Sequence, residues 1–402
     1  MKRHLPMSRI LFARIFFSFL LVCCFLILNI KISVAQEDES TVDQEMVPSE
    51  ADAKQVVEIE KKKEQAQAWL PAPPPPDEFD WIQLTSGEWL KGEFKALYEK
   101  KLEFDSDELD LLKLDWEDVK QVRGHQVFSL RFEGPITVIG LVQVNEDKVY
   151  VATDAGRQEF ARNQLIAIVP GEPKEINYWS AKISIGINLS EGNTDQLQFN
   201  SKWNVMRRTS ATRFIVDYLG NYTTTDNVET VDNQRLNGNF DIMMTRKYYI
   251  RAVFAEYYRD PFQNIKSRTT LGAGVGYHII DTSRTDWEVT AGPAYQETNF
   301  VSVEPGEASS VSTPVFAAGT DFDIELTNKI DFIINYSFNI VNEESGQYTH
   351  HALATLETEI TDILDFDISV VWDRTEKPTA RADGSIPEKD DYQLIFWVGV
   401  DF

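Results

Sequence analysis

The chain has 402 residues, enough for two or three domains, and it carries 64 acidic against 39 basic side chains. This acidic balance argues against a nucleic-acid partner, because phosphate binding requires a basic face. The mean hydropathy of −0.31 excludes a bundle of transmembrane helices. It is compatible with a membrane barrel, in which only alternate residues face lipid.

The N-terminal segment has the composition of a secretory signal peptide. Basic residues precede an apolar run at 15–28, and residues 33–35 offer the spacing that a signal peptidase recognises. We predict a signal peptide over residues 1–35, with an uncleaved membrane anchor as the alternative. Both cysteines, Cys23 and Cys24, lie in this segment. Cleavage would therefore leave no disulfide and no cysteine-based metal or nucleophile site.

Residues 36–78 are polar and mostly acidic, and we expect a spacer that is either helical or disordered. The sequence at 49–52 is typical of a helix N-terminus, whereas the scarcity of apolar residues after it favours disorder. A proline-rich run at 71–76 favours the polyproline II form, which would make a stiff spacer of roughly 20 Å. This run predicts a domain boundary.

Residues 79–173 contain an internal duplication with an offset of 46 to 47 residues. Three pairs of segments correspond: 86–87 with 133–134, 101–104 with 148–151, and 114–122 with 160–168. Each copy consists of short alternating segments separated by Gly or Asp turns, a pattern typical of β-strands. We predict a small duplicated β module of the SH3 or Sm type, either one β-barrel or a pair of them, located in the periplasm. Peptidoglycan or another envelope protein is its expected partner.

Residues 178–402 repeat segments of about 10–15 residues in which apolar and polar side chains alternate, as in the strands of a membrane barrel. We predict an antiparallel transmembrane β-barrel in a bacterial outer membrane, and hence an all-β protein. Its twelve strands are expected at 179–189, 196–206, 213–223, 234–244, 248–259, 268–279, 285–299, 313–326, 330–341, 349–360, 364–373 and 392–402.

The connections between these segments are alternately long and short, which is typical of a barrel with both ends in the periplasm. The long connections are expected at 190–195, 224–233, 260–267, 300–312, 342–348 and 374–391.

The last segment places Tyr392, Phe396 and Phe402 on one face with other apolar residues. In a soluble sandwich, which is the alternative, such an exposed strand would invite aggregation. In a barrel it pairs with the first strand, 179–189, so that no edge remains. We predict that the three aromatic residues form the signal read by the barrel-assembly machinery.

The alternation also assigns side chains to the two faces of the wall. Twelve carboxylates are expected in the lumen: Asp217, Asp241, Glu288, Asp321, Asp323, Glu325, Asp331, Glu357, Glu359, Asp365, Asp367 and Asp373. Four bases accompany them: Lys182, Lys202, Arg213 and Arg251. Aromatic residues near the strand ends are expected in interfacial girdles: Trp179, Tyr222, Tyr248, Tyr258, Trp287, Tyr348 and Trp372. The fifth strand is ambiguous, and its alternation leaves Glu256 outward with Phe254.

The barrel region also resembles a known family. The similar positions are Trp179 with 190–195 in an opening hairpin, 257–262, Arg268 and 272–277 in a central motif, and 292–295 in the following strand. They resemble the YdiY-like domain family of unknown function, over about residues 178–402. The resemblance implies an outer-membrane location and no established activity. No catalytic residues are therefore carried over.

Candidate catalytic groups are few. Nucleophilic catalysis needs a base within hydrogen-bond reach of the nucleophile. No grouping with His125, His278, His350 or His351 resembles the serine, histidine and asparagine of outer-membrane phospholipase A. The spacing does not force His278 toward the aspartates at 321 and 323. We expect no enzyme activity, no metal and no cofactor.

The lumen residues suggest a function. Glu357 and Glu359 are expected to face Asp365 and Asp367, and carboxylates that line a pore favour cations. The sequence therefore predicts a narrow cation-preferring pore, or a structural role in the envelope, in contact with outer-membrane lipid. A lipid or peptide hydrolase and an adhesin are the alternatives.

Overall fold

The computed structural model describes residues 79–171, 175–191, 195–327, 329–361 and 363–401. The predicted signal peptide and spacer lie outside these residues. The described residues belong to one compact unit. Within them, no helix is long and apolar enough to cross a membrane.

The first part of this unit is a nine-stranded antiparallel sheet in the order β4-β3-β2-β1-β5-β6-β7-β8, with β9 paired to β2 and β5. We call it the β module. Its strands are β1 (Asp80–Leu84), β2 (Trp89–Tyr98), β3 (Lys101–Ser106), β4 (Asp110–Asp115), β5 (Val119–Phe132), β6 (Ile136–Val144), β7 (Lys148–Thr153), β8 (Gly156–Ala161) and β9 (Leu165–Pro170). A short 3-10 helix, η1 (Arg162–Gln164), precedes β9.

The two sequence copies become two five-stranded units that share β5. In the first unit β1 pairs with the start of β5, where Ile82 lies opposite Val122. In the second unit the end of β5 pairs with β9, where Leu130 lies opposite Ile168. Buried side chains from both units pack into one hydrophobic core. The β module is therefore a single folded body and not a pair of separate barrels.

The second part is a closed barrel of twelve consecutive antiparallel strands, which confirms the predicted fold class. The strands are β10 (Trp179–Ser190), β11 (Gln196–Arg208), β12 (Thr212–Thr225), β13 (Val228–Met243), β14 (Tyr248–Asp260), β15 (Ile265–Asp281), β16 (Thr285–Phe300), β17 (Ser310–Thr327), β18 (Ile330–Ile340), β19 (Tyr348–Thr361), β20 (Leu364–Thr375) and β21 (Asp390–Asp401). Three 3-10 helices accompany them: η2 (Glu175–Tyr178), η3 (Pro261–Gln263) and η4 (Glu343–Ser345).

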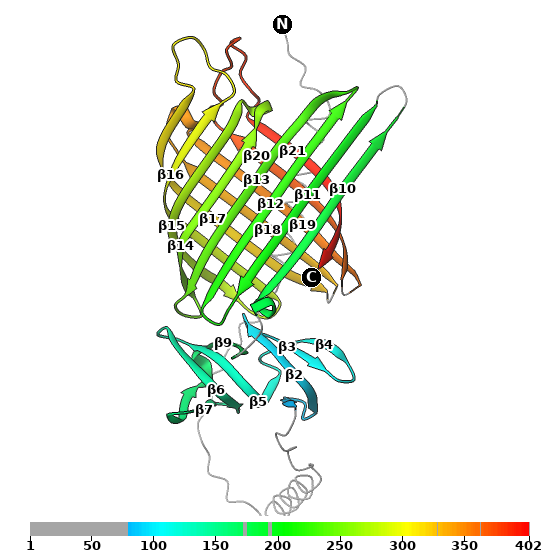
Figure 1. Cartoon of the computed structure of the whole chain (residues 1–402), viewed down its shortest axis with the longest axis vertical. Helices are drawn as coiled ribbons and strands as arrows, with labels where there is room; N and C mark the ends of the chain where they lie inside the picture. Colours follow the sequence, from blue (N-terminus) through cyan, green and yellow to red (C-terminus); the bar gives the residue numbers. More distant parts are fainter. Residues whose placement is uncertain (1–78, 172–174, 192–194, 328, 362, 402) are drawn as a thin grey trace, which may run out of the picture. The chain divides into compact units, whose positions relative to one another are not determined.

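The barrel closes where its first and last strands meet. β10 pairs with β21 from Lys182 opposite Asp401 to Ile185 opposite Val398, as the sequence predicts. The strands run at a slant to the barrel axis (Figure 1). Closing a sheet requires this tilt.

One predicted connection is wrong. Residues 224–233 were expected to form a long loop, but β12 ends at Thr225 and β13 begins at Val228. Asp226 and Asn227 form the turn, with φ angles of 52° and 61°. Asp and Asn tolerate this left-handed conformation and favour a tight two-residue hairpin. The polar residues that follow belong to a strand and not to a loop.

The ambiguous fifth strand, β14, is resolved by a β-bulge between Arg251 and Phe254. A bulge adds one residue and reverses the alternation after it. Glu256 and Phe254, expected outward, therefore turn toward the lumen. The predicted place of Tyr258 in an interfacial girdle is wrong for the same reason. Its side chain also turns inward, and only 3 % of the residue is exposed.

Candidate lumen site

The wall of the barrel separates an apolar outer surface from a charged interior. On β11, outward Leu197, Phe199 and Trp203 are 40–48 % exposed, whereas inward Asn200 is 4 % exposed. A closed barrel leaves no unpaired strand edge in hydrocarbon, and its apolar exterior suits lipid. The chain is an outer-membrane β-barrel protein.

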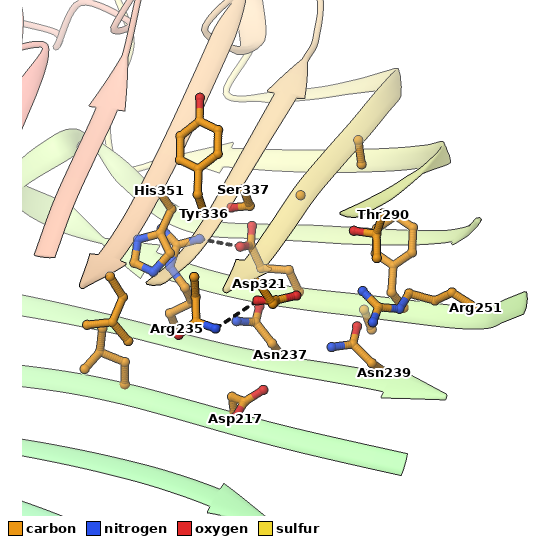
Figure 2. A pocket seen from close by; sticks show the side chains of 18 of the residues that line it. Asp217, Arg235, Asn237, Asn239, Arg251, Thr290, Asp321, Tyr336, Ser337 and His351 are labelled. Atoms are coloured by element: carbon orange, nitrogen blue, oxygen red, sulfur yellow. Dashed lines mark hydrogen bonds and ion pairs between the residues drawn. The ribbon is translucent and has the colours of Figure 1, made fainter. Parts of the chain in front are cut away.

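The lumen contains a cavity of about 480 Å³, within the usual range of about 300–1,000 Å³ for ligand sites. Charged side chains line it from opposite walls (Figure 2): Asp217, Arg235 and Arg251 on β12–β14, and Asp321 and His351 on β17 and β19. Asparagine and threonine side chains lie between these charges. Apolar side chains, among them Leu219, Phe254 and Leu353, also line the cavity. Its lining is therefore mixed, with charged groups on opposite walls.

Two lysines pair with three of the carboxylates on β19 and β20. The Nζ of Lys182 lies 2.5 Å from oxygens of both Glu357 and Asp365. The Nζ of Lys202 lies 3.0 Å from Asp367. Glu357 and Asp367 are direct cross-strand neighbours. The predicted juxtaposition of like charges is therefore present, and these bases screen it.

A second group of charges centres on Arg213. Its Nη2 lies 3.0 Å from oxygens of both Asp241 and Glu288. Arg251 donates to the other oxygen of Asp241 over 2.8 Å. Asp241 is fully buried and Glu288 is 5 % exposed. Each carboxylate therefore needs the guanidinium of Arg213 to compensate for its lost hydration.

His278 lies beside Asp286 and Glu288 rather than beside Asp321 and Asp323. Its Nδ1 is 3.0 Å from Asp286, and its Nε2 is 3.7 Å from Glu288. Among the described residues, these three place potential metal-ligand atoms within 4.8 Å of one another. Glu288 is already held by an arginine, so a metal ion would have to displace that guanidinium.

His351 belongs to a third group that the sequence analysis did not assemble. Its Nδ1 lies 2.9 Å from Asp373, which also accepts from Arg235 over 2.7 Å. Arg235 pairs with Glu256 as well. Ser337 on β18 is the direct cross-strand neighbour of His351. These residues lie on five strands, β13, β14, β18, β19 and β20. Cross-strand register combined with inward parity is therefore the signal that would have revealed the group.

The remaining predicted lumen carboxylates differ in their surroundings. Asp321 accepts from the Nδ2 of Asn335 over 2.8 Å, and Asp323 is exposed. Glu325 and Glu359 are paired with lysines of the β module, Lys101 at 3.1 Å and Lys113 at 3.7 Å.

The residues of the predicted assembly signal lie on the last strand. Phe396 is 54 % exposed on the outer face and stacks on Phe366, and Tyr392 is the cross-strand neighbour of Trp372. On the inner face Trp397 is fully buried. Phe402 lies outside the described residues.

Residues 183–402 match the family model described as "Protein of unknown function, DUF481". No curated protein sequence matches the chain. Among solved structures, the NanC porin is 9 % identical with a TM-score of 0.34, and the match covers 56 % of this chain and 98 % of that one. The translocator domain of the autotransporter NalP from Neisseria meningitidis is 14 % identical with a TM-score of 0.31, covering 56 % and 86 %. A Pseudomonas aeruginosa FadL homologue is 11 % identical with a TM-score of 0.29, covering 56 % and 79 %.

Proposed function

We propose that this chain, which belongs to the DUF481 family of proteins of unknown function, is a narrow pore that prefers cations. The cavity inside the closed barrel, which is lined by charged side chains on opposite walls, carries the proposal. Twelve strands enclose more space than the eight that side chains can fill, and less than the 16 to 18 of porins. A passage of this size suits ions and small hydrophilic solutes.

The preference for cations follows from which lumen charges are paired. Arg235 pairs with Glu256 and Asp373, and Arg251 pairs with Asp241. Lys182 and Lys202 offset the carboxylates at 357, 365 and 367. Asp217 and Asp321 line the cavity but bond to the amides of Asn204 and Asn335. Amides leave the carboxylate charge in place, and carboxylates that line a pore attract cations. We assign most of the selectivity to these two aspartates.

Conductance of the purified full chain in a planar bilayer tests the proposal. In a salt gradient, we expect a reversal potential whose sign indicates selectivity for cations. Its magnitude should be smaller when Asp217→Asn and Asp321→Asn are combined. Glu304→Gln, in an exposed loop, is the matched control and should leave the potential unchanged. Anion preference would refute the selectivity, and an absence of conductance would favour a structural role.

We propose a periplasmic location for the β module. The start of β10 and the end of β21 lie at the rim that carries the turns after β11, β13, β15, β17 and β19. All five of these turns are short, and short turns are periplasmic in outer-membrane barrels. There the β module could engage peptidoglycan or another envelope protein. Protease treatment of intact cells should spare it, and cleavage would contradict the location.

A hydrolase is the second candidate function, and Ser337, His351 and Asp373 favour it. The His351–Asp373 bond orients the imidazole as in serine hydrolases, and Ser337 is the cross-strand partner of His351 and lines the same cavity. A fluorophosphonate reagent should then label the wild type but neither the Ser337→Ala nor the His351→Ala variant. Unlabelled wild-type protein would remove this candidate.

A further inference from the structure

We propose that the β module is a plug for the barrel, and that Glu99 is the latch that holds it in the lumen mouth. The proposal rests on the pore function, and it assigns to the β module the task of closing that pore. The contacts around Glu99 and those around the rim support it separately.

The latch sits on an unusual turn. Glu99 and Lys100 connect β2 to β3, and both have positive φ angles, 45° and 60°. Two-residue hairpins of this kind ordinarily use Asn and Gly, because other side chains are strained there. Strained positions often coincide with functional ones. Here the two strained positions are charged residues at the tip of a hairpin.

Glu99 forms ion pairs with arginines of the barrel. Its carboxylate pairs with Arg208 at the end of β11, and the Nη1 of Arg213 lies 3.7 Å away. Arg213 also binds Glu288 inside the lumen. Tyr98 packs its ring against Arg208, and its hydroxyl donates to the backbone oxygen of that arginine over 3.1 Å. The hairpin tip is thus connected directly to the charges of the pore.

Further contacts of the β module reach four separate regions of the same rim. They are Ser129 with Ser210 (3.0 Å), Arg131 with the backbone oxygen of Met243 (2.7 Å), Lys101 with Glu325 (3.1 Å) and Lys113 with Glu359 (3.7 Å). Contacts on one side would merely tether the β module. Contacts distributed over β11–β13, β17 and β19 cover the opening.

The character of these contacts indicates a reversible closure. They are hydrogen bonds and ion pairs, and the partly exposed pairs of Lys101 and Lys113 contribute little stability individually. Interfaces that open and close are more polar than permanent ones. A plug held in this way can leave the mouth without unfolding either part.

An engineered disulfide tests docking and closure together. The hydroxyl oxygens of Ser129 and Ser210 are 3.0 Å apart, so Ser129→Cys and Ser210→Cys in the full chain should form a disulfide on oxidation. The two single-cysteine variants control for Cys23 and Cys24. We expect the oxidised protein to be silent in a planar bilayer and the reduced protein to conduct.

A charge variant supplies a second readout. Glu99→Gln should increase the time spent in the conducting state several-fold, whereas Glu117→Gln should not. Among the described residues, the ion pair of Glu117 lies within the β module, with Lys100. Failure of the disulfide to form would overturn docking, and equal conductance of the oxidised and reduced protein would overturn closure. If the disulfide forms and no variant conducts, the pore function fails and closure fails with it, while docking stands.

Discussion

Lys182 on the first barrel strand reaches across the last strand and binds Asp365 on β20, with 2.5 Å between its Nζ and the carboxylate. Gly399 on β21 permits this crossing. A Cβ at that position would lie 3.2 Å from the Cε of Lys182 and 3.0 Å from the hydroxyl of Ser184. Since β10 and β21 show only a short paired register, the ion pair reinforces the seam of the barrel.

Replacing Lys182 with Met should therefore destabilise the barrel. The change leaves Asp365, which is 1 % exposed, without its cation. Removing one partner of a buried pair costs about 3–5 kcal/mol, and we expect the free energy of unfolding in urea to fall by that amount. Lys329→Met, in an exposed turn, should change little. Equal urea midpoints for both variants would show that the bridge does not support the seam.

Gly276 should tolerate no side chain. It lies opposite Tyr249 on β14, and a Cβ at Gly276 would come within 2.0 Å of that ring. Gly276→Val must displace a fully buried tyrosine, at a cost of about 1–3 kcal/mol. On a gel, an unboiled sample of the folded barrel should run as a compact band, and heating should convert it to the band of the unfolded chain. For Gly276→Val this conversion should occur at a lower temperature than for the wild type. The matched change Gly238→Val, where no atom lies within 4 Å, should leave the conversion temperature unchanged.

Deleting Phe402 should reduce the amount of protein assembled in the outer membrane. The predicted assembly signal uses the terminal aromatic residue together with outward Phe396 of β21. We expect more protein in the periplasm or degraded, measured by fractionation and immunoblotting. Phe262→Ala, in a 42 % exposed position outside the strands, is the control. Unchanged outer-membrane levels after the deletion would count against the signal.

The Glu99 latch should weaken in acid. Burial alone would raise the pKa of Glu99, but Arg208 and Arg213 outweigh it and hold the pKa at about 2, below the usual 4.5. A carboxyl group whose pKa is lowered in the docked state stabilises that state. This contribution is complete above pH 4.5 and disappears as the pH falls toward 2. The other titratable groups that act on Glu99 or are influenced by it are Tyr98, His278, Asp281 and Asp286.

Protonation of His278 adds a positive charge facing Glu99, so it opposes release. Conductance of the wild type should consequently rise only between about pH 4.5 and 2. Glu99→Gln should already show the higher conductance at neutral pH and no further rise in acid. A rise of the same size in both proteins would assign the pH dependence to other groups.

The strands, their number and most of their faces are determined by the sequence alone. Alternation with period two is a local property, and a strand with one face in lipid must follow it. Leu197, Phe199 and Trp203 are outward because every second residue of β11 is apolar, whatever the neighbouring strands do. The closing strand is recognisable for the same reason.

The partners of the charged residues were decided by the tertiary structure. A bulge in β14 reverses the faces of Glu256 and Tyr258, and no local pattern marks where it falls. Lys182 meets Asp365 because the strands close into a tilted barrel with a glycine at the crossing point. His351 meets Asp373 through cross-strand register, and Glu99 meets Arg208 through docking of two parts of the chain. Each contact joins residues distant in sequence, so it depends on geometry that forms only when the sheets are complete.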